Sequence, residues 1–186
     1  MDIQALTYDE LDLDQVHAVR RLAWLDKYPV FAEHIAVWED AFERRATHFI
    51  MTDLEQLVGV ARFNYADAPS LRSQFKHAPD MVRFVGSLRS PVGVISRLSV
   101  HPNARGRGVA KQLDEARIAF AKAQNCSAIV CEVKTGAHRE AALARLGFTP
   151  VENAKPYPAY PFPHVDKAPI RLCQPLFMQL DQRPSK

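Results

Sequence analysis

The first part of the chain shows a strand-like pattern followed by a helix-like one. Apolar and polar residues alternate loosely over Ile3–Tyr8, which predicts a first strand. Apolar side chains then recur at helical spacing over Leu13–Ala23, and Asp12 or Asp14 is available as the N-cap. Pro29 follows this segment, so we expect the first helix to end before it.

A second helix and a hairpin are predicted next. The helix covers about Phe31–Arg45, a stretch rich in Ala, Glu and aromatic residues. Thr47–Met51 and Leu57–Tyr65 are β-branched or apolar runs. They flank the polar sequence Thr-Asp-Leu-Glu-Gln, which is typical of a turn, so the two runs are predicted to pair as a β-hairpin.

The segment from Val92 to Phe148 has the most regular pattern. A strand is predicted over Val92–Val100, and a helix of about four turns follows, with one face formed by Val109, Leu113, Ala116 and Phe120. Ala128–Cys131 is a continuous apolar run, as in a strand covered on both faces. Strand, helix and strand predict a right-handed βαβ unit. A further helix over Ala137–Leu146 should end at Gly147.

Two segments are irregular in sequence. Ala66–Pro91 predicts either a solvated loop with a short helix or a lid that faces the substrate, because loops this long are often functional. Pro150–Pro169 contains six prolines, and we expect no regular element there. The final run Ile170–Leu180 predicts a strand, and Pro175 within it requires an edge position or a bulge.

Composition indicates an ordinary globular protein. The 186 residues are 47% hydrophobic and 24% charged, which fits one domain with segments 1–65, 66–91, 92–151 and 152–186. The net charge of +3 is too small to indicate a nucleic-acid partner. We expect no membrane segment and no signal peptide. The cysteines lack disulfide or metal-site spacing, which favours a cytoplasmic protein; they are Cys126, Cys131 and Cys173.

The turn between the predicted strand and the long helix carries candidate chemistry. It reads Arg105-Gly106-Arg107-Gly108-Val109-Ala110, and Lys111 follows. Two glycines before a helix allow a tight turn that presents successive N–H groups, and the helix N-terminus adds partial positive charge. The turn therefore predicts a phosphate site, surrounded by mobile cationic side chains. It lacks the Lys-Ser/Thr of a Walker loop and the third glycine of a Rossmann fingerprint.

Together with its neighbours, this turn resembles the GNAT acyltransferase superfamily. The matching motifs are Leu98-Ser99-Val100-His101-Pro102, Arg105-x-x-Gly108-x-Ala110 and Leu146-Gly147-Phe148. The resemblance covers residues 92–151 most clearly. It implies an α/β (α+β) fold in which a mixed central sheet is splayed between its fourth and fifth strands and flanked by about four helices. It also implies acetyl-CoA as co-substrate, and we expect no metal.

The resemblance assigns roles to residues of this chain. The backbone of Leu98, Ser99 and Val100 would pair with the pantetheine arm, and an N–H near Leu98 would polarise the thioester carbonyl. The pyrophosphate would be held by Arg105 and by the amides of Gly106, Arg107, Gly108, Val109, Ala110 and Lys111. In this family, an amine generally attacks the thioester directly. The reaction needs a base to deprotonate the ammonium form of the acceptor and an acid to protonate the leaving thiolate.

The sequence departs from the family at two positions. The frequent tyrosine acid falls on Leu143, and the asparagine that often contacts pantetheine falls on Gly136. Either the thiolate leaves without a proton donor, or Tyr157 or Tyr160 of the proline-rich segment protonates it. Loss of catalysis is the remaining alternative.

Glu132 is the candidate base, because apolar neighbours could desolvate it and raise its pKa. The alternative is a salt bridge to Arg97 or Lys134. Ser96 and Arg97 lie where the family often places catalytic or substrate-binding groups, and Arg97 could bind a substrate carboxylate or pair with Glu132. The weaker candidates are His101, whose alternative role is to end the strand, and His138, which fits a helix start.

Three functions remain open from the sequence. The first is an N-acetyltransferase for a small-molecule amine or amino acid, with a homodimer as one option for its assembly. The second is transfer of longer acyl chains from CoA or from an acidic carrier protein, which would suit the basic residues Arg72, Lys76, Arg83 and Arg89. The third is an acyl-CoA-binding sensor without catalysis. Turnover by the purified protein separates the third from the others.

Overall fold

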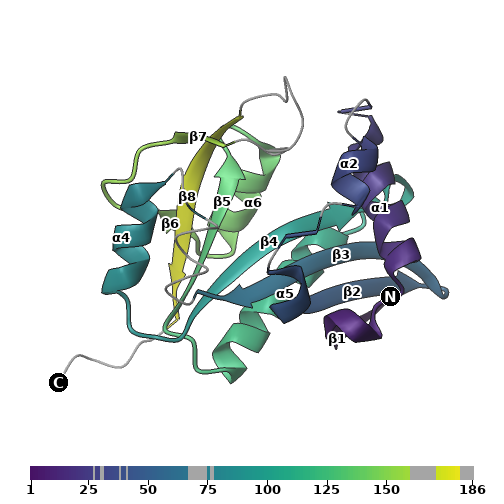
Figure 1. Ribbon diagram of the computed structural model, residues 1–186, viewed down its shortest axis with the longest axis horizontal. Coiled ribbons are helices and arrows are strands. Elements are labelled where there is room, and N and C mark those ends of the chain that lie inside the picture. Colours follow the sequence, from purple (N-terminus) through teal and green to yellow (C-terminus); the bar gives the residue numbers. More distant parts are fainter. Residues whose placement is uncertain are drawn as a thin grey trace. The chain divides into compact units, whose positions relative to one another are not determined.

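The computed structural model describes residues 1–26, 28–29, 32–37, 39–40, 42–66, 75, 78–159 and 171–180. The strands are β1 (Asp2–Leu6), β2 (Thr47–Asp53), β3 (Gln56–Tyr65), β4 (Val92–Val100), β5 (Ala128–Lys134), β6 (Thr149–Pro150), β7 (Tyr157–Ala159) and β8 (Arg171–Gln179). Hydrogen bonds join them in the order β1-β2-β3-β4-β5-β8-β6, with β7 beside β8 (Figure 1). This mixed sheet with its helices confirms the predicted fold class.

The described residues outside the sheet include several helices. They are α1 (Leu13–Leu25), α2 (Ala32–Val37), α4 (Pro79–Ser87), α5 (Val109–Ala123) and α6 (His138–Arg145), with short 3₁₀ turns at Tyr8–Glu10, Glu43–Arg45 and Pro102–Ala104. The chain divides into two compact units. The first contains residues 1–64 and 96–117, and the second contains residues 65–95 and 118–186.

The first unit contains the predicted hairpin. β2 and β3 pair antiparallel, and β1 pairs with the other edge of β2. The turn is shorter than predicted, because Leu54 and Glu55 both take positive φ values of 48° and 66° and connect the strands directly. β1 ends at Leu6 because Thr7 and Glu10 form a capping box that starts the first 3₁₀ turn.

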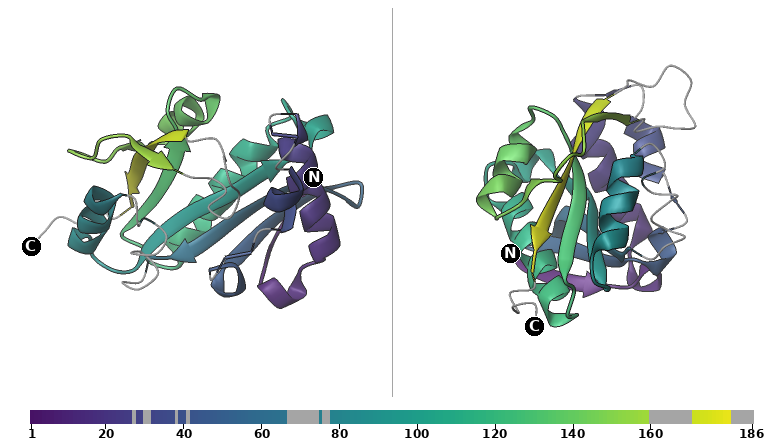
Figure 2. Two further views of the ribbon diagram at one scale, coloured as in Figure 1. Left: turned by 45° about the horizontal axis from the view of Figure 1, so that its top comes forward. Right: turned by 90° about the vertical axis from the view of Figure 1, so that its left-hand side faces the viewer.

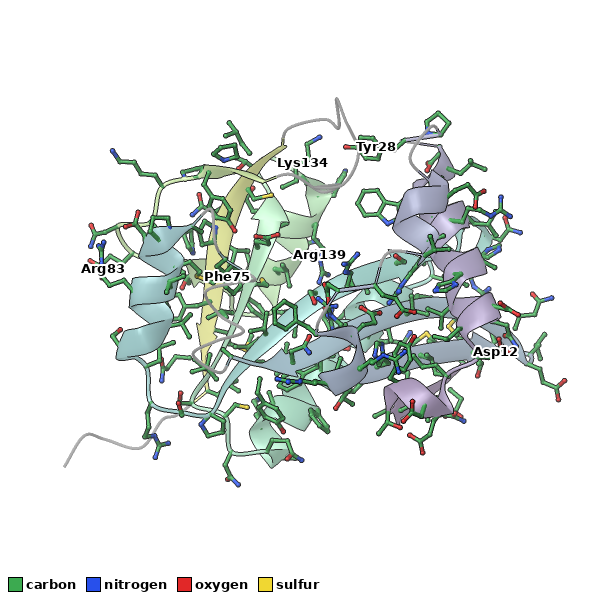
Figure 3. The ribbon with its side chains drawn as sticks, in the orientation of Figure 1. Asp12, Tyr28, Phe75, Arg83, Lys134 and Arg139 are labelled. Atoms are coloured by element: carbon green, nitrogen blue, oxygen red, sulfur yellow. The ribbon has the colours of Figure 1, made fainter. Side chains whose placement is uncertain are left out.

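The start of α1 follows the sequence closely. Its N-cap is Asp12, whose carboxylate accepts from the Gln15 N–H at 3.1 Å (Figure 3). Val16 and Val19 point into a core cluster that also contains Leu57 and Val60 of β3. The apolar face predicted from the helical spacing is therefore the face that α1 buries.

The predicted second helix is wrong in length. α2 ends at Val37, and the Asp40 side chain accepts from the Phe42 N–H at 3.0 Å. This local contact competes with helical hydrogen bonds. The Glu43–Arg45 turn then leads into β2. The predicted start of this helix, Phe31, lies outside the described residues.

In the second unit, α4 and α6 lie on opposite sides of the β5–β8 strands (Figures 1 and 2). β5 pairs in parallel with Val92–Val94 of β4, which confirms the predicted βαβ unit. Ala128 and Val130 of β5 belong to one core cluster with Met81, Val85 and Phe75, the last labelled in Figure 3. Ile129 and Cys131 are buried as well, so both faces of β5 are covered, as its apolar run predicts.

Pro175 does not mark a sheet edge. β8 pairs with β5 along one side and with β6 and β7 along the other. The β7 pairing covers Arg171–Cys173 and the β6 pairing covers Leu176 and Phe177, so Pro175 lies between them. Its carbonyl accepts from the Val151 N–H at 3.0 Å. In a strand, the N–H and the carbonyl of one residue point to the same side, so an N–H at this position would point away from β5. The proline therefore removes no hydrogen bond to β5.

Two other predictions near the C-terminus have different outcomes. α6 ends as expected, and Gly147 has φ 98°. The Gly147 N–H donates to the Ala144 carbonyl, and the Phe148 N–H donates to the Leu143 carbonyl. The absence of regular structure after Pro150 is wrong, because Tyr157–Ala159 forms β7 against β8. Residues 160–170 lie outside the described part of the chain.

Candidate active site

The glycine turn before α5 has the geometry of an anion site. Gly106 and Gly108 adopt φ values of 77° and 81°, which favour glycine. The first helical hydrogen bond runs from the Gln112 N–H to the Gly108 carbonyl, at 3.0 Å. The amides of Gly108, Val109, Ala110 and Lys111 therefore precede the first intrahelical donor, at the positive end of the helix. A pyrophosphate fits this set, because four consecutive N–H donors are presented without a competing carboxylate of the turn itself.

The cations around the turn are paired rather than mobile. Arg105 contacts Asp26 at 2.8 Å and the Ala23 carbonyl at 2.8 Å. Arg107 contacts Asp53 at 2.6 Å, and the Lys111 ammonium lies 3.5 Å from a carboxylate oxygen of Glu115. These pairs are substantially exposed, and exposed pairs are worth about 0–1 kcal/mol. A phosphate could therefore draw these side chains away from their carboxylates at small cost.

β4 carries an irregular residue just before the predicted pantetheine segment. Arg97 has φ 54°, a left-handed conformation of the kind found in β-bulges. After it, Ser99 is buried, whereas Leu98 and Val100 are partly exposed. The predicted contacts of these three residues with pantetheine remain a prediction.

Arg97 belongs to a cluster that the sequence did not predict. This arginine–carboxylate cluster consists of Arg20, Asp40, Glu43, Arg62 and Arg97. Nη1 of Arg62 lies 2.7 Å from Asp40 and 2.6 Å from Glu43, and Arg20 pairs with Glu43. Nη2 of Arg97 lies 3.0 Å from Asp40. Asp40 is therefore a carboxylate partner of Arg97 that the sequence did not indicate, and the pairing of Arg97 with Glu132 stays a prediction.

Ser96 joins the cluster through its hydroxyl, which accepts from Nε of Arg62 at 3.0 Å. The signal for this cluster was present in the sequence. Arg62 interrupts the apolar β3, and Arg20 stands among the apolar positions of α1. A charged residue inside an apolar pattern usually has a buried partner, but the sequence does not show which one.

The cluster lowers the pKa values of Asp40, Glu43 and Arg97, for different reasons in the acids and in the arginine. Burial raises the pKa of Asp40, but the charges and hydrogen bonds of Arg62 and Arg97 outweigh it and lower that pKa to about 2. The pKa of Glu43 is likewise lowered, because Arg20 and Arg62 outweigh its burial. Burial and the neighbouring Arg62 lower the pKa of Arg97 to about 10, against the opposing effect of Asp40. At neutral pH all three groups carry charge.

A second buried ion pair contacts the backbone of two cluster strands, β3 and β4. Arg117 of α5 pairs with Asp114, and both side chains are 1% exposed. The Arg117 guanidinium also donates to the carbonyls of Arg62 and Ser96, at 3.2 and 3.1 Å. It therefore links α5 to β3 and to β4, at the residue before Arg97 with its positive φ.

In the second unit, Glu132 accepts a hydrogen bond from the hydroxyl of Tyr157. Glu132 lies at an exposed position of β5, so the expected desolvation by its apolar neighbours is not seen. Burial, and next the charge of Glu132, raise the pKa of Tyr157, which keeps the hydroxyl protonated. Leu143, at the position of the family's tyrosine, is 1% exposed and belongs to the core. Tyr160 lies outside the described residues.

The remaining candidates have local partners. Nδ1 of His101 accepts from the Asn103 N–H at 3.2 Å, so it caps the turn that follows β4. His138 is the first residue of α6, as predicted. The Gly136 N–H donates to Glu140 at 2.8 Å.

The structure describes two of the four basic residues considered for a carrier protein. Arg83 projects from α4 and is 80% exposed (Figure 3), and the Arg89 carbonyl accepts from Ser127. Arg72 and Lys76 lie outside the described part.

Comparison with protein-family models gives a match to the acetyltransferase (GNAT) family over residues 14–148. The chain belongs to this family. The matched region includes the glycine turn, β4 and Leu143. No curated protein matches the chain at a significant level. The family also agrees with the parallel β4–β5 pair and with the long helix α5 that joins these strands.

Solved structures of the same fold cover nearly the whole chain. The N-acetyltransferase from Staphylococcus aureus Mu50 is 15% identical, with 97% of this chain and 98% of that chain covered and a TM-score of 0.64. The ribosomal-protein-S18-alanine N-acetyltransferase from Escherichia coli is 13% identical, with 100% and 97% covered and a TM-score of 0.63. A Bacillus subtilis acetyltransferase in complex with CoA is 17% identical, with 96% and 98% covered and a TM-score of 0.62. At such identities the likeness shows the fold.

The GNAT family supports acyl transfer and CoA binding as the general activity of this chain. The described part of the chain contains no helix that is long and apolar enough to cross a membrane. The absence of a metal, the cytoplasmic location and the homodimer remain predictions.

Proposed function

We propose that this protein transfers an acetyl group from acetyl-CoA to the primary amine of a small molecule or amino acid. The observation that supports this proposal is the glycine turn, whose amides from Gly108 to Lys111 have the geometry of an anion site in a chain of the GNAT family. When bound, acetyl-CoA supplies the acetyl group as an activated thioester. The turn would hold its pyrophosphate, with Arg105, Gly106 and Arg107 at the rim.

Transfer requires that the acceptor nitrogen attack the thioester carbonyl carbon, so that a C–N bond forms and the C–S bond breaks. The acceptor must first lose the proton of its ammonium form. Glu132 is the proposed base, since its carboxylate already shares a hydrogen bond with Tyr157. A backbone N–H near Leu98 is the proposed donor to the developing oxyanion.

Tyr157 is the proposed acid for the leaving thiolate. Its hydroxyl is protonated at neutral pH. The charge of Glu132 helps to raise its pKa, and this charge is removed once Glu132 has taken the proton of the ammonium group, so the hydroxyl can then give its proton. Tyr157 occupies β7, whereas the family's frequent tyrosine position on α6 is the buried Leu143. The proton lost by Tyr157 can be restored from Glu132, because the two side chains are hydrogen-bonded.

Turnover by the purified protein tests the proposal, measured as free thiol released from acetyl-CoA in the presence of amines. Glu132→Gln should lower kcat by about 10²- to 10⁴-fold with little change in affinity for CoA. Tyr157→Phe should lower kcat at high pH, where free amine is abundant and deprotonation no longer limits. CoA binding without thiol release would favour the sensor, and faster transfer from longer acyl-CoAs would favour the alternative donor.

The donor site has its own test at Gly108. Gly108→Glu and Gly108→Gln place side chains of nearly equal size at the same positive φ, so they share the backbone strain and differ in charge. Gly108→Glu should abolish CoA binding through repulsion of the phosphates, and Gly108→Gln should lose much less. Equal affinities of the two variants for CoA would argue against the assigned phosphate site.

A further inference from the structure

Ser96 of β4 has a hydroxyl group that accepts a hydrogen bond and donates none within the described part of the chain. Nε of Arg62 lies 3.0 Å from the Ser96 oxygen. A guanidinium group has no acceptor atom, so the serine must be the acceptor in this contact. No described residue accepts the proton of the Ser96 hydroxyl, which is therefore available to a bound molecule.

Buried groups hold both the side chain and the backbone of Ser96. Arg62 is 2% exposed, and its Nη1 atom donates to Asp40 at 2.7 Å and to Glu43 at 2.6 Å. Arg117 is 1% exposed and donates to the Ser96 carbonyl at 3.1 Å. The hydroxyl is thus held in place before any ligand binds, and a donor held in this way needs little reorganisation when charge develops beside it.

The contact with Arg62 also strengthens the hydroxyl as a donor. A hydroxyl that accepts a hydrogen bond from a cation is polarised, and its own proton is then donated more strongly. Ser96 is partly exposed, whereas Arg62 is buried behind it. The serine is therefore the member of this pair that can contact a ligand.

Ser96 lies in the part of β4 to which the transfer chemistry is assigned. It directly precedes Arg97, which has a φ of 54°. Non-glycine residues held in such conformations cluster at active sites and ligand sites. Leu98, whose N–H is the proposed donor to the developing oxyanion, is two residues further along the same strand. All three residues belong to the first compact unit.

We propose that the Ser96 hydroxyl donates a hydrogen bond to the carbonyl oxygen of the acetyl thioester, as a second donor beside the N–H near Leu98. This inference rests on the proposed acetyl transfer. The carbonyl oxygen gains negative charge when the amine attacks, so a donor to it binds the transition state more strongly than the ground state. The attacking nitrogen needs its lone pair for the carbonyl carbon and gains nothing from a donor. Ser96 keeps its proton throughout.

Infrared spectroscopy of bound acetyl-CoA tests this contact without any acceptor, using a heavy carbon isotope in the carbonyl group to identify its band. A hydrogen bond to the carbonyl oxygen weakens the C=O bond. The C=O stretch should therefore lie at a lower wavenumber in the wild-type protein than in Ser96→Ala. Ser96→Thr keeps a hydroxyl group and should retain most of this difference. Equal wavenumbers in the wild-type protein and in Ser96→Ala, with acetyl-CoA bound to both, would overturn the proposal.

Kinetics with an amine that the wild-type protein acetylates measure the effect on the transition state. Ser96→Ala should lower kcat by about 10²- to 10³-fold with little change in affinity for acetyl-CoA, which is the usual loss for one donor to an oxyanion. Ser96→Asp separates this effect from a structural one. Its carboxylate can still accept from Arg62 but has no proton to donate at neutral pH, so kcat should fall at least as far as in Ser96→Ala while Tm stays near the wild-type value.

Ser87→Ala is the matched control. The Ser87 hydroxyl, at the end of α4, already donates to the Phe84 carbonyl at 2.6 Å, so its proton is in use within the protein. This variant should keep the wild-type kcat and the wild-type C=O stretch.

The remaining outcomes separate this inference from the proposed function. A wild-type kcat in Ser96→Asp would limit the serine to accepting from Arg62 and would overturn the inference alone. A loss confined to the affinity for acetyl-CoA would do the same. Absence of thiol release with every amine would overturn the proposed function and this inference together. If Ser96→Ala fails to fold, Ser96→Thr and Ser96→Asp still compare a side chain with the hydroxyl proton and one without it.

Discussion

At the scale of single residues, the molecule depends on charges that are buried in pairs. Arg117 and Asp114 are both 1% exposed, and Arg117 also donates to two strand carbonyls. Such a pair gives little net stability relative to apolar residues, but removing one partner leaves an uncompensated charge. The structure therefore depends on both partners being present rather than on the strength of their attraction.

Arg117→Met should lower the free energy of unfolding by about 3–5 kcal/mol, because Asp114 and the carbonyls of Arg62 and Ser96 lose their donor. Urea denaturation gives the value. The double variant Asp114→Leu with Arg117→Met should be less destabilised than the sum of the two single variants, since no buried carboxylate remains. A loss below about 1 kcal/mol in Arg117→Met would show that the pair is dispensable.

The second residue-scale prediction concerns pH. The pKa of Asp40 falls from 3.8 in the unfolded chain to about 2 in the folded protein. A lowered carboxyl pKa gives stability that is present above pH 4 and lost as the pH falls towards 2. The difference corresponds to about 2 kcal/mol. Asp40→Asn should therefore show a shallower loss of urea stability between pH 4 and pH 2 than the wild-type protein.

The control for this pH dependence is Asp9→Asn, because Asp9 is an exposed residue of the Tyr8–Glu10 turn, outside the cluster. Its urea stability should follow the wild-type curve. If Asp40→Asn also followed the wild-type curve, the stabilising charges around Asp40 would be weaker than the geometry indicates.

At the scale of elements, Gly59 allows β3 and α5 to approach each other closely. A Cβ at this position would lie 2.6 Å from Cγ1 of Val109 and 2.9 Å from Cδ1 of Leu113. Both contacts are shorter than ordinary van der Waals distances. Val109 is the first residue of α5, so the position of the amides at the helix start depends on this glycine.

Gly59→Ala should destabilise the protein by about 1–3 kcal/mol, because the added methyl must push the side chains of Val109 and Leu113, or α5 with them, away from β3. It should also weaken CoA binding, since the amides at the start of α5 move with the helix. Gly86→Ala is the control: Gly86 lies in α4, and a methyl group there would meet no atom within 4 Å, so this change should be neutral or stabilising by up to about 1 kcal/mol. Thermal unfolding and CoA titration of both variants measure the effects.

Periodicity in the sequence predicted the elements whose pattern is set locally. α1, β4 and α5 follow their apolar spacing, and α1 begins after Asp12, one of its two expected N-caps. The predicted length of the second helix was wrong, because side-chain contacts decide the structure there. Asp40 accepts hydrogen bonds from the Phe42 backbone and from Arg62, and α2 ends before Asp40.

The same reason explains what was found and missed in the candidate site. The glycine turn could be predicted because its residues are adjacent in sequence. The arginine–carboxylate cluster could not, because Arg20, Asp40 and Arg62 come from three separate parts of the chain. The hydroxyl of Tyr157 was an open alternative in the sequence, and the pairing of β7 with β8 brings it to Glu132.

At the scale of the whole molecule, CoA binding should appear as stability, because a ligand that binds the folded state alone shifts the unfolding equilibrium. At about 100 times its dissociation constant, CoA should add about 2.7 kcal/mol. For a chain of 186 residues this raises Tm by several degrees. CoA, acetyl-CoA and longer acyl-CoAs should all raise it through the phosphate site, and Gly108→Glu should remove the shift for all of them. A larger shift with longer acyl chains would point to a wider acyl site, whereas a shift in the wild-type protein that persists in Gly108→Glu would place the phosphates elsewhere.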